Sequence, residues 1–192
     1  MTRLSTALVH HPCLDAQGEV YTTSLTNLDV HDIARSSRTF GASAFYVVTP
    51  IEAQRQLAAA IAGFWDGTKR AQKVPSRAQA MRLLRVVVAL EDAIAAETEA
   101  LGEPPLVIAT SARDEALALD HPTLRARMAQ AAGALVVFGT GYGLAPQALS
   151  LADVRLVPIV GPGDYNHLSV RSAAAIVLDR LRSPDHDRQQ QH

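Results

Sequence analysis

Apolar residues are distributed along the chain in two patterns. Some form short unbroken runs, and others recur every three or four residues. The unbroken runs, many of them β-branched, predict strands at residues 7–11, 44–49, 106–109, 134–138 and 155–160. Helical spacing predicts helices at 27–39, 52–65, 77–101, 121–132 and 167–181, with a short helical piece after Pro146. Strands that alternate with helices and are apolar throughout predict an α/β fold with a mainly parallel sheet covered on both faces.

Local signals refine the ends of these elements. Thr26, with Asp29 three residues later, is typical of a helix N-cap, and Gly41 ends that helix. The longest predicted helix, 77–101, rests on an apolar stripe and ends at Gly102; the stripe is Leu83, Val87, Leu90, Ile94 and Leu101. Residues 66–75 are polar and carry both lysines, which predicts an exposed loop.

The chain has 192 residues, of which 48% are hydrophobic, so it can bury the core of a single domain. We expect this domain to span residues 1–182 and a disordered polar tail to occupy residues 183–192. No apolar stretch reaches the length of a membrane span, and the N-terminus lacks a signal-peptide pattern. We therefore expect a cytoplasmic protein with no membrane association.

The formal net charge is −1, which excludes a globally basic coat for nucleic acid but leaves room for a local basic face. A single cysteine, Cys13, excludes an intramolecular disulfide framework and thiolate zinc clusters. His10 and His11 precede it, but neighbouring residues of a strand point to opposite faces. We therefore expect no bound metal.

Three alternating glycines, Gly139, Gly141 and Gly143, follow a predicted strand. A dinucleotide-binding fold is disfavoured because fewer than 50 residues follow, too few for the rest of its sheet. Two interpretations stay open: a tight turn that needs positive φ, and a backbone cradle for another nucleotide-like ligand.

His31, Arg35 and Arg38 share one face of the first predicted helix, which is either a solvated basic face or a surface that contacts phosphate or RNA. The segment 164–171 opens the last predicted helix, and Asn166 is a candidate N-cap there.

Three segments, taken in order, resemble the motifs of the SPOUT superfamily of knotted RNA methyltransferases. The first motif is matched by residues 29–35 with 38–41, the second by 136–144, and the third by 157–161 with 166–174. Residues 22–29 and 165–172 resemble a small bacterial group within it, that of predicted S-adenosylmethionine-dependent RNA methyltransferases. SpoU-type members often carry a Glu in the second-motif loop, where this chain has residues 140–142, and an Asn where it has Ser169. Methylation of a base and of a ribose therefore both remain open.

The resemblance implies a deep trefoil knot at the C-terminal end, a homodimer packed through the first and last helices, and S-adenosylmethionine as cofactor. It implies that the adenosine is held after three strands, by Thr110, Ser111, Ala112, Phe138, Gly139, Gly141, Gly143, Leu144, Val157, Ile159, Gly161, Leu168 and Ser169. Arg35 is the candidate catalytic residue, and the candidate RNA contacts are His31, Arg35, Arg38, Asn166, His167 and Arg171.

The expected activity is methyl transfer from S-adenosylmethionine to tRNA or rRNA. Two alternatives stay open at this point. One is a module that binds the cofactor or RNA without catalysis, and the other is a methyltransferase for a substrate other than RNA.

Overall fold

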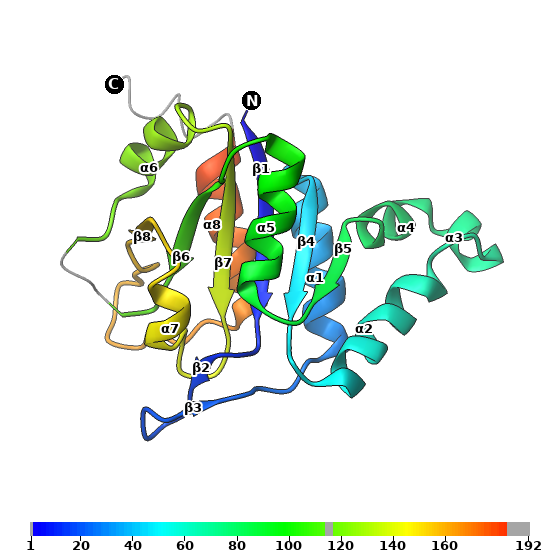
Figure 1. Ribbon diagram of the computed structural model, residues 1–192, viewed down its shortest axis with the longest axis horizontal. Coiled ribbons are helices and arrows are strands. Elements are labelled where there is room, and N and C mark those ends of the chain that lie inside the picture. The colour runs from blue at the N-terminus through cyan, green and yellow to red at the C-terminus, as the bar shows by residue number, and fades with distance from the viewer. Residues whose placement is uncertain (1, 114–116, 184–192) are drawn as a thin grey trace.

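The computed structural model describes residues 2–113 and 117–183 and is built around a six-stranded sheet (Figure 1). The strands are β1 (Arg3–Val9), β4 (Ala44–Val48), β5 (Leu84–Val87), β6 (Leu106–Thr110), β7 (Gly133–Gly139) and β8 (Val154–Leu156). Their order is β5-β4-β1-β7-β6-β8, and every neighbouring pair is parallel. The predicted α/β fold with a mainly parallel sheet is confirmed.

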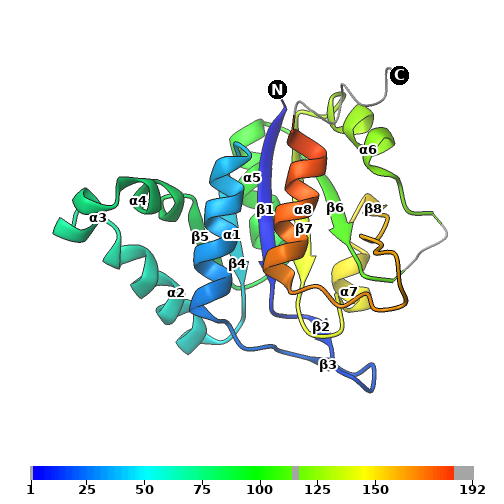
Figure 2. The same ribbon diagram turned by 180° about the vertical axis from the view of Figure 1, so that it is seen from behind.

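Helices cover both faces of the sheet (Figures 1 and 2). One face carries α1 (Asn27–Thr39) and α8 (Val170–Arg182), with α6 (His121–Met128) against α8. The other carries α5 (Leu90–Leu101) and the short α7 (Pro146–Leu149). Beyond the β5 edge, α2 (Glu52–Phe64), α3 (Lys69–Lys73) and α4 (Pro75–Met81) project sideways. A small antiparallel hairpin, β2 (Cys13–Leu14) with β3 (Val20–Tyr21), lies below the sheet in Figure 1.

The central strand β1 shows why the sheet needs two covered faces. Leu4 and Leu8 are buried in the core formed with α1 and α8, whereas Ala7 and Val9 are buried in the core formed with α5. Side chains alternate between the faces of a strand, so both sets of neighbours must be apolar. Each fully buried Leu contributes roughly 2 kcal/mol to folding, which makes β1 an anchor for both layers.

The first predicted helix has the predicted boundaries. The Thr26 hydroxyl accepts a hydrogen bond from the Asp29 backbone N–H at 3.2 Å and donates to the Asp29 carboxylate at 2.6 Å. Thr26 is therefore the N-cap, as expected. The helix gives way at Gly41, whose φ of +72° is a backbone conformation that favours glycine.

The single long helix predicted at 77–101 is wrong. The structure divides this stretch into α4, strand β5 and α5. Val86, Val87 and Val88 form a β-branched run that favours a strand, and the strand pairs with β4. The apolar stripe was misleading because its residues do not belong to one helix: Leu83 precedes β5, Val87 lies in β5, and the other three lie in α5.

Other boundaries also differ from the prediction. The expected loop at 66–75 contains the short helix α3, and the strand expected at 155–160 ends at Leu156. The last helix begins at Val170, and Ser169, not Asn166, is its N-cap, because the Ser169 hydroxyl accepts from the Ser172 N–H at 3.3 Å. The predicted helix at 121–132 ends at Met128. Of the predicted disordered tail, residues 184–192 lie outside the described residues.

A charged cluster is buried between α5 and the sheet. The Glu97 carboxylate, 1% exposed, accepts hydrogen bonds from Arg3 Nε at 2.9 Å and from the Tyr46 hydroxyl at 2.8 Å. Burial raises the pKa of Glu97, but the hydrogen bonds from Arg3 and Tyr46 outweigh it, so the net direction is downward. The cluster therefore holds an ionised carboxylate that ties α5 to β1 and β4.

Replacing this carboxylate should destabilise the protein. Glu97→Ala leaves the partners of a buried ion pair without their acceptor, and we expect a loss of roughly 3 kcal/mol in the free energy of unfolding. Glu99→Ala, at an exposed position of the same helix, should change it by less than about 0.5 kcal/mol. Urea denaturation of both variants measures the difference, and equal midpoints would contradict a structural role for the cluster.

Candidate cofactor and RNA site

The carboxyl ends of β6, β7 and β8 bring three loops to one edge of the sheet. These are residues 110–112, 139–144 and 157–169, which hold all the predicted cofactor contacts except Phe138, a buried residue of β7. The side-chain amide of Asn166 donates to the Ala112 carbonyl at 3.2 Å and so links the first loop to the third. In open α/β sheets ligands bind outside the carboxyl ends of the strands, so this edge is the expected place for a cofactor.

The loop after β7 requires its glycines. A Cβ on Gly139 would lie 2.8 Å from the Leu144 backbone nitrogen, and one on Gly141 would collide with the Tyr21 hydroxyl. Gly141 and Gly143 have φ of +61° and +109°. The loop is thus a tight turn with positive φ, and its compactness also leaves main-chain groups accessible to a ligand.

The β2–β3 hairpin braces this glycine loop from below. The Leu14 N–H donates to the Gly143 carbonyl at 2.9 Å, and the Tyr142 N–H donates to the Leu14 carbonyl at 3.0 Å. A third bond runs from the Ala145 N–H to the Pro12 carbonyl at 3.1 Å. The hairpin is therefore a supporting element of the site that was not predicted from the sequence.

A chain of hydroxyl groups ties the same loop to the end of β1. Thr140 donates to the Val9 carbonyl at 2.9 Å, and the Thr140 and Thr23 hydroxyl oxygens lie 2.5 Å apart. Thr23 in turn lies 2.7 Å from Nδ1 of His10, and Cys13 Sγ lies 3.5 Å from Thr140. We call His10, Thr23 and Thr140 the loop lock; none of the three was a predicted site residue.

The donors of the loop lock define the state of His10. Because Thr140 donates to Val9 and Thr23 donates to Thr140, Nδ1 of His10 carries the proton that reaches Thr23. Nε2 is buried with no partner among the described residues, so a proton there would have no acceptor. Burial accordingly lowers the pKa of His10 to about 4, and the imidazole is neutral at pH 7.

The edge fits an adenosine-bearing cofactor. Its loops expose large apolar side chains that no other described part of the protein covers, namely Tyr142 (59% exposed), Val160 (71%), Tyr165 (78%) and Leu168 (47%). Adenine binding needs an apolar wall together with backbone hydrogen-bonding groups, and these loops offer both. No group of three or more His, Cys, Asp or Glu side chains within residues 2–113 and 117–183 is arranged to hold a metal ion.

A hollow of about 460 Å³ lies between α1 and α8. From α1 it is lined by Arg35 and Ser36, among others, and from α8 and its cap by Ser169, Arg171 and Ser172. Arg35, predicted from the first motif, and Ser169, predicted from the third, therefore line one site although they are far apart in the sequence.

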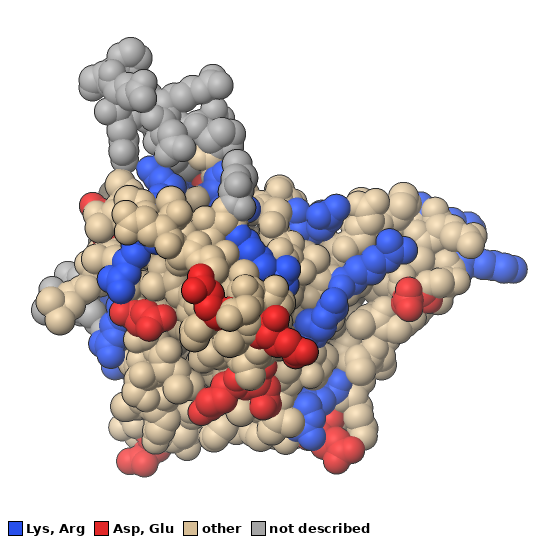
Figure 3. Space-filling model, turned by 45° about the horizontal axis from the view of Figure 1, so that its top comes forward, with Lys and Arg blue, Asp and Glu red and all other residues tan. Residues whose placement is uncertain are grey.

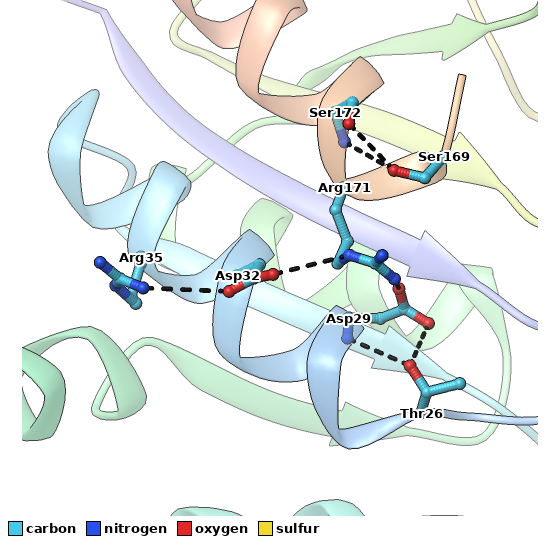
Figure 4. A network of polar contacts seen from close by, with 7 residues as sticks. All are labelled: Thr26, Asp29, Asp32, Arg35, Ser169, Arg171 and Ser172. Atoms are coloured by element: carbon cyan, nitrogen blue, oxygen red, sulfur yellow. Dashed lines mark hydrogen bonds and ion pairs between the residues drawn. The ribbon is translucent and has the colours of Figure 1, made fainter.

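An ion-pair chain runs along this hollow (Figure 4). Nη1 of Arg171 donates to the Asp29 carboxylate at 2.9 Å, and Nε of Arg171 lies 3.5 Å from the other acid, Asp32. Asp32 also lies 3.9 Å from Nη1 of Arg35, whose side chain is 58% exposed. Arg171 is thus held firmly between two carboxylates, whereas Arg35 is held loosely and can turn toward a ligand.

The remaining predicted RNA contacts lie at different places. Arg38 is exposed near the end of α1, and His167 is exposed with its ring 5.2 Å from that of Tyr165. His31 packs edge to face on Trp65 at 6.0 Å. Burial, followed by the charge of Arg77, lowers the pKa of His31, so near neutral pH this residue adds no positive charge to the face.

Comparison with known proteins identifies the class. A model of the SAM-dependent RNA methyltransferase family matches residues 3–183. The chain belongs to this family, and S-adenosylmethionine is the family's cofactor. The resemblance read from the three motifs is confirmed at this level. Among the described residues, no helix is long and apolar enough to cross a membrane.

Two curated relatives are named tRNA (guanine-N(1)-)-methyltransferase. The one from Oleidesulfovibrio alaskensis is 44% identical over 175 residues, and the one from Nitratidesulfovibrio vulgaris is 42% identical over 175 residues. Each match covers 91% of this chain but only 41% of the relative. A protein of Aquifex aeolicus is 38% identical over 92% of this chain and 87% of its own length. The shared unit therefore occurs both within longer proteins and as most of a protein.

Solved structures with the same fold are also methyltransferases. A probable methyltransferase from Bordetella pertussis matches with a TM-score of 0.63 at 16% identity, over 94% of this chain and 93% of that one. The SpoU methyltransferase AviRb from Streptomyces viridochromogenes, in complex with AdoMet, matches with a TM-score of 0.57 at 18% identity, over 98% and 58%. At these identities the likeness establishes the fold.

The buried His10 should make folding pH-dependent. Its folded pKa of about 4 lies below the unfolded value of about 6.5, so between these values the unfolded chain binds more protons. The contribution of His10 to the free energy of unfolding is therefore complete above pH 6.5. It falls as the pH drops toward 4, by up to about 3 kcal/mol. Urea denaturation at pH 7.5 and at pH 4.5 measures this loss of stability. In His10→Asn the free energy of unfolding should differ less between the two pH values than in the wild type, whereas the exposed control His167→Asn should show the wild-type difference.

The loop lock should set cofactor affinity. Thr140→Val removes the donor to Val9, and the freed glycine loop should bind S-adenosylmethionine roughly tenfold more weakly, the effect of about 1.4 kcal/mol. Thr98→Val is the control, because it removes only a hydroxyl contact to the preceding turn of α5. Calorimetric titration compares the two, and unchanged affinity in Thr140→Val would show that the lock does not shape the cofactor site.

Proposed function

We propose that this chain transfers the methyl group of S-adenosylmethionine to an RNA and that the RNA is a tRNA. The observation that carries the proposal is the shared hollow, where Arg35 lies opposite Ser169, the cap of α8 at which the third loop ends. The family supports RNA as substrate, and the names of the two longer relatives support tRNA. Because the chain spans 41% of those relatives, their guanine-N1 chemistry is not carried over, and base and ribose are separate outcomes of the test.

The proposed division of work follows the geometry. The loops 110–112, 139–144 and 157–169 hold the adenosine through main-chain groups and the exposed apolar side chains. The bound cofactor supplies an electrophilic methyl group. Arg35 binds a phosphate next to the target nucleotide and orients the acceptor atom, because a guanidinium does not act as a base at neutral pH. Arg38 contacts the RNA backbone.

Arg171, Asn166 and His167 have different parts in this proposal. Arg171 positions α8 against α1 through Asp29 and Asp32. Asn166 holds the third loop near Ala112. His167, exposed beside the ring of Tyr165, is the group of this loop that is free to reach RNA.

The proposal also includes the assembly. Two copies pack through α1 and α8, so that the hollow of one copy faces the other, and residues 1–182 form one domain with a C-terminal trefoil knot. Family membership across residues 3–183 supports this arrangement. A cytoplasmic location follows from a tRNA substrate.

The direct test is to incubate the protein with methyl-labelled S-adenosylmethionine and unfractionated bacterial tRNA or rRNA, then digest to nucleosides. The proposal expects label in a nucleoside from tRNA, and the nucleoside identifies base or ribose. Label in neither RNA, with cofactor binding intact, would refute it.

Loss of Arg35 should remove catalysis while leaving the fold intact. Arg35→Ala should lower methyl transfer roughly 100-fold, the effect expected when a positioned charge at a reacting centre is lost. The melting temperature should change little because the Arg35 side chain is exposed, and the affinity for S-adenosylmethionine should remain unchanged. Arg38→Ala should mainly weaken RNA binding, and the control Arg127→Ala on α6 should do neither. Normal turnover in Arg35→Ala would end its assignment.

The assembly can be measured separately. Light scattering at micromolar concentration should give twice the mass of one chain. The ion pair at the base of the hollow is intramolecular, so Asp29→Asn should loosen α8 and shift the mass toward one chain as the protein is diluted. A mass of one chain for the wild type throughout would contradict the dimer.

A further inference from the structure

The helices α2, α3 and α4 form an arm, residues 52–82, that projects from the β5 edge of the sheet (Figure 1). The arm is longer than a connection between β4 and β5 requires, since short links of a few residues with one helix suffice in other α/β units. Apart from Ala58, Trp65 and the buried face of α4, most of its surface is exposed. Packing against the core therefore does not account for the length of the arm, which indicates a separate role.

The arm and strand β5 carry most of the molecule's charge asymmetry. Residues 52–87 hold seven Lys or Arg against two acidic residues, Glu52 and Asp66. The rest of the chain holds the other 11 of the 18 cations and 17 of the 19 acidic residues. The near-neutral chain therefore consists of a basic arm and a body with an excess of acidic residues. Figure 3 shows Lys and Arg side chains along the arm, whereas the body carries Asp and Glu interspersed with Lys and Arg.

The cations at the tip are available to a ligand. Lys69, Arg70 and Lys73 lie on α3, are exposed, and make no ion pair with any residue in the described ranges. Lys73 and Lys69 are the only lysines of the chain. A solvated surface usually intersperses both signs, so an uncompensated cluster produces a local positive field that attracts polyanions.

Trp65 fixes the arm to the helix that carries Arg35. The indole is 5% exposed, packs edge to face on His31 of α1 at 6.0 Å, and has the Arg77 guanidinium 5.4 Å above it. Arg77 of α4 and His31 of α1 thus contact the same indole. The arm is therefore packed directly against α1, the helix whose Arg35 lines the hollow.

An exposed aromatic ring lies on the same arm. Phe64 is 55% exposed, and its ring meets Trp65 at a centroid distance of 5.3 Å and an angle of 85°. The buried Trp65 thus holds an exposed phenyl group at a defined position between the tip and α1. Exposed cations and an exposed aromatic ring on one element are the combination that binds phosphates and stacks on unpaired bases.

We propose that the arm is an RNA-docking element: Lys69, Arg70 and Lys73 bind phosphates, and Phe64 stacks on an unpaired base. It deepens the proposed function, on which it rests, because docking here leads the RNA along α1 to Arg35. The arm supplies affinity and register, while the hollow supplies the chemistry.

The test uses the full chain and unfractionated bacterial tRNA as probe. In Lys69→Gln/Arg70→Gln/Lys73→Gln, the slope of log affinity against log salt should become less steep by about 2–3, since each lost phosphate contact lowers it by about 0.7–0.9. At 0.1 M salt the affinity should fall roughly tenfold or more. KM for RNA should rise by the same factor, whereas kcat and cofactor affinity should stay constant.

Two further variants separate stacking from charge. Phe64→Ala should weaken tRNA binding roughly tenfold with an unchanged salt slope, because stacking releases no counterions. Leu57→Ala, exposed on the same arm, is its control, and Arg127→Gln on α6 is the control for charge. Both controls should bind tRNA as the wild type does.

The outcomes are distinct from those for the catalytic proposal. Wild-type tRNA binding by the triple variant would overturn the docking role and leave the methyltransferase intact. Equal losses toward tRNA and polyglutamate, with no effect of Phe64→Ala, would assign the arm to acidic surfaces in general and also overturn it. A wild type that neither binds nor methylates RNA would end both proposals.

Discussion

The ion pair between Arg171 and Asp29 is the contact on which the site depends. It joins the first turn of α8 to the first turn of α1, at 2.9 Å, and the same guanidinium also reaches Asp32. The two helices come from opposite ends of the chain, so nothing local holds them in register. Because both carboxylates engage Arg171, the neighbouring Arg35 keeps only a loose 3.9 Å contact and remains available to a phosphate.

A second constraint acts at the end of the central strands. The Thr140 hydroxyl ties the glycine loop to the last carbonyl of β1, and the hairpin holds the loop from the other side. The neutral His10 completes this arrangement without bringing a charge into it. Buried polar contacts thus preorganise the proposed cofactor edge, while the surfaces of α1 and the arm that we propose to contact RNA remain exposed. This division suits a small rigid cofactor and a large polyanionic substrate.

The features that could be predicted from the sequence are those that depend on neighbouring residues. The buried strands β4, β6 and β7 stand out as β-branched runs, and Thr26 marks the start of α1. Strand β5 was hidden because its valines also continue a helical stripe and no Gly or Pro separates it from its neighbours. Thr140 and Thr23 could not be predicted as a pair, since they are 117 residues apart and only the β1–β7 pairing brings them together. The uneven charge of residues 52–87 is visible in the sequence. That most of these residues form a projecting arm is not.

The central claim is that RNA reaches the site along the arm and α1. Ultraviolet cross-linking of 4-thiouridine-containing tRNA to the protein, in the presence of S-adenosylhomocysteine and followed by mass spectrometry of the peptides, tests this path directly. The account predicts cross-linked peptides from the arm and from α1 around Arg35 and Arg38. Cross-links that instead fall on α5, whose exposed surface carries Glu91, Asp92 and Glu99, would contradict it.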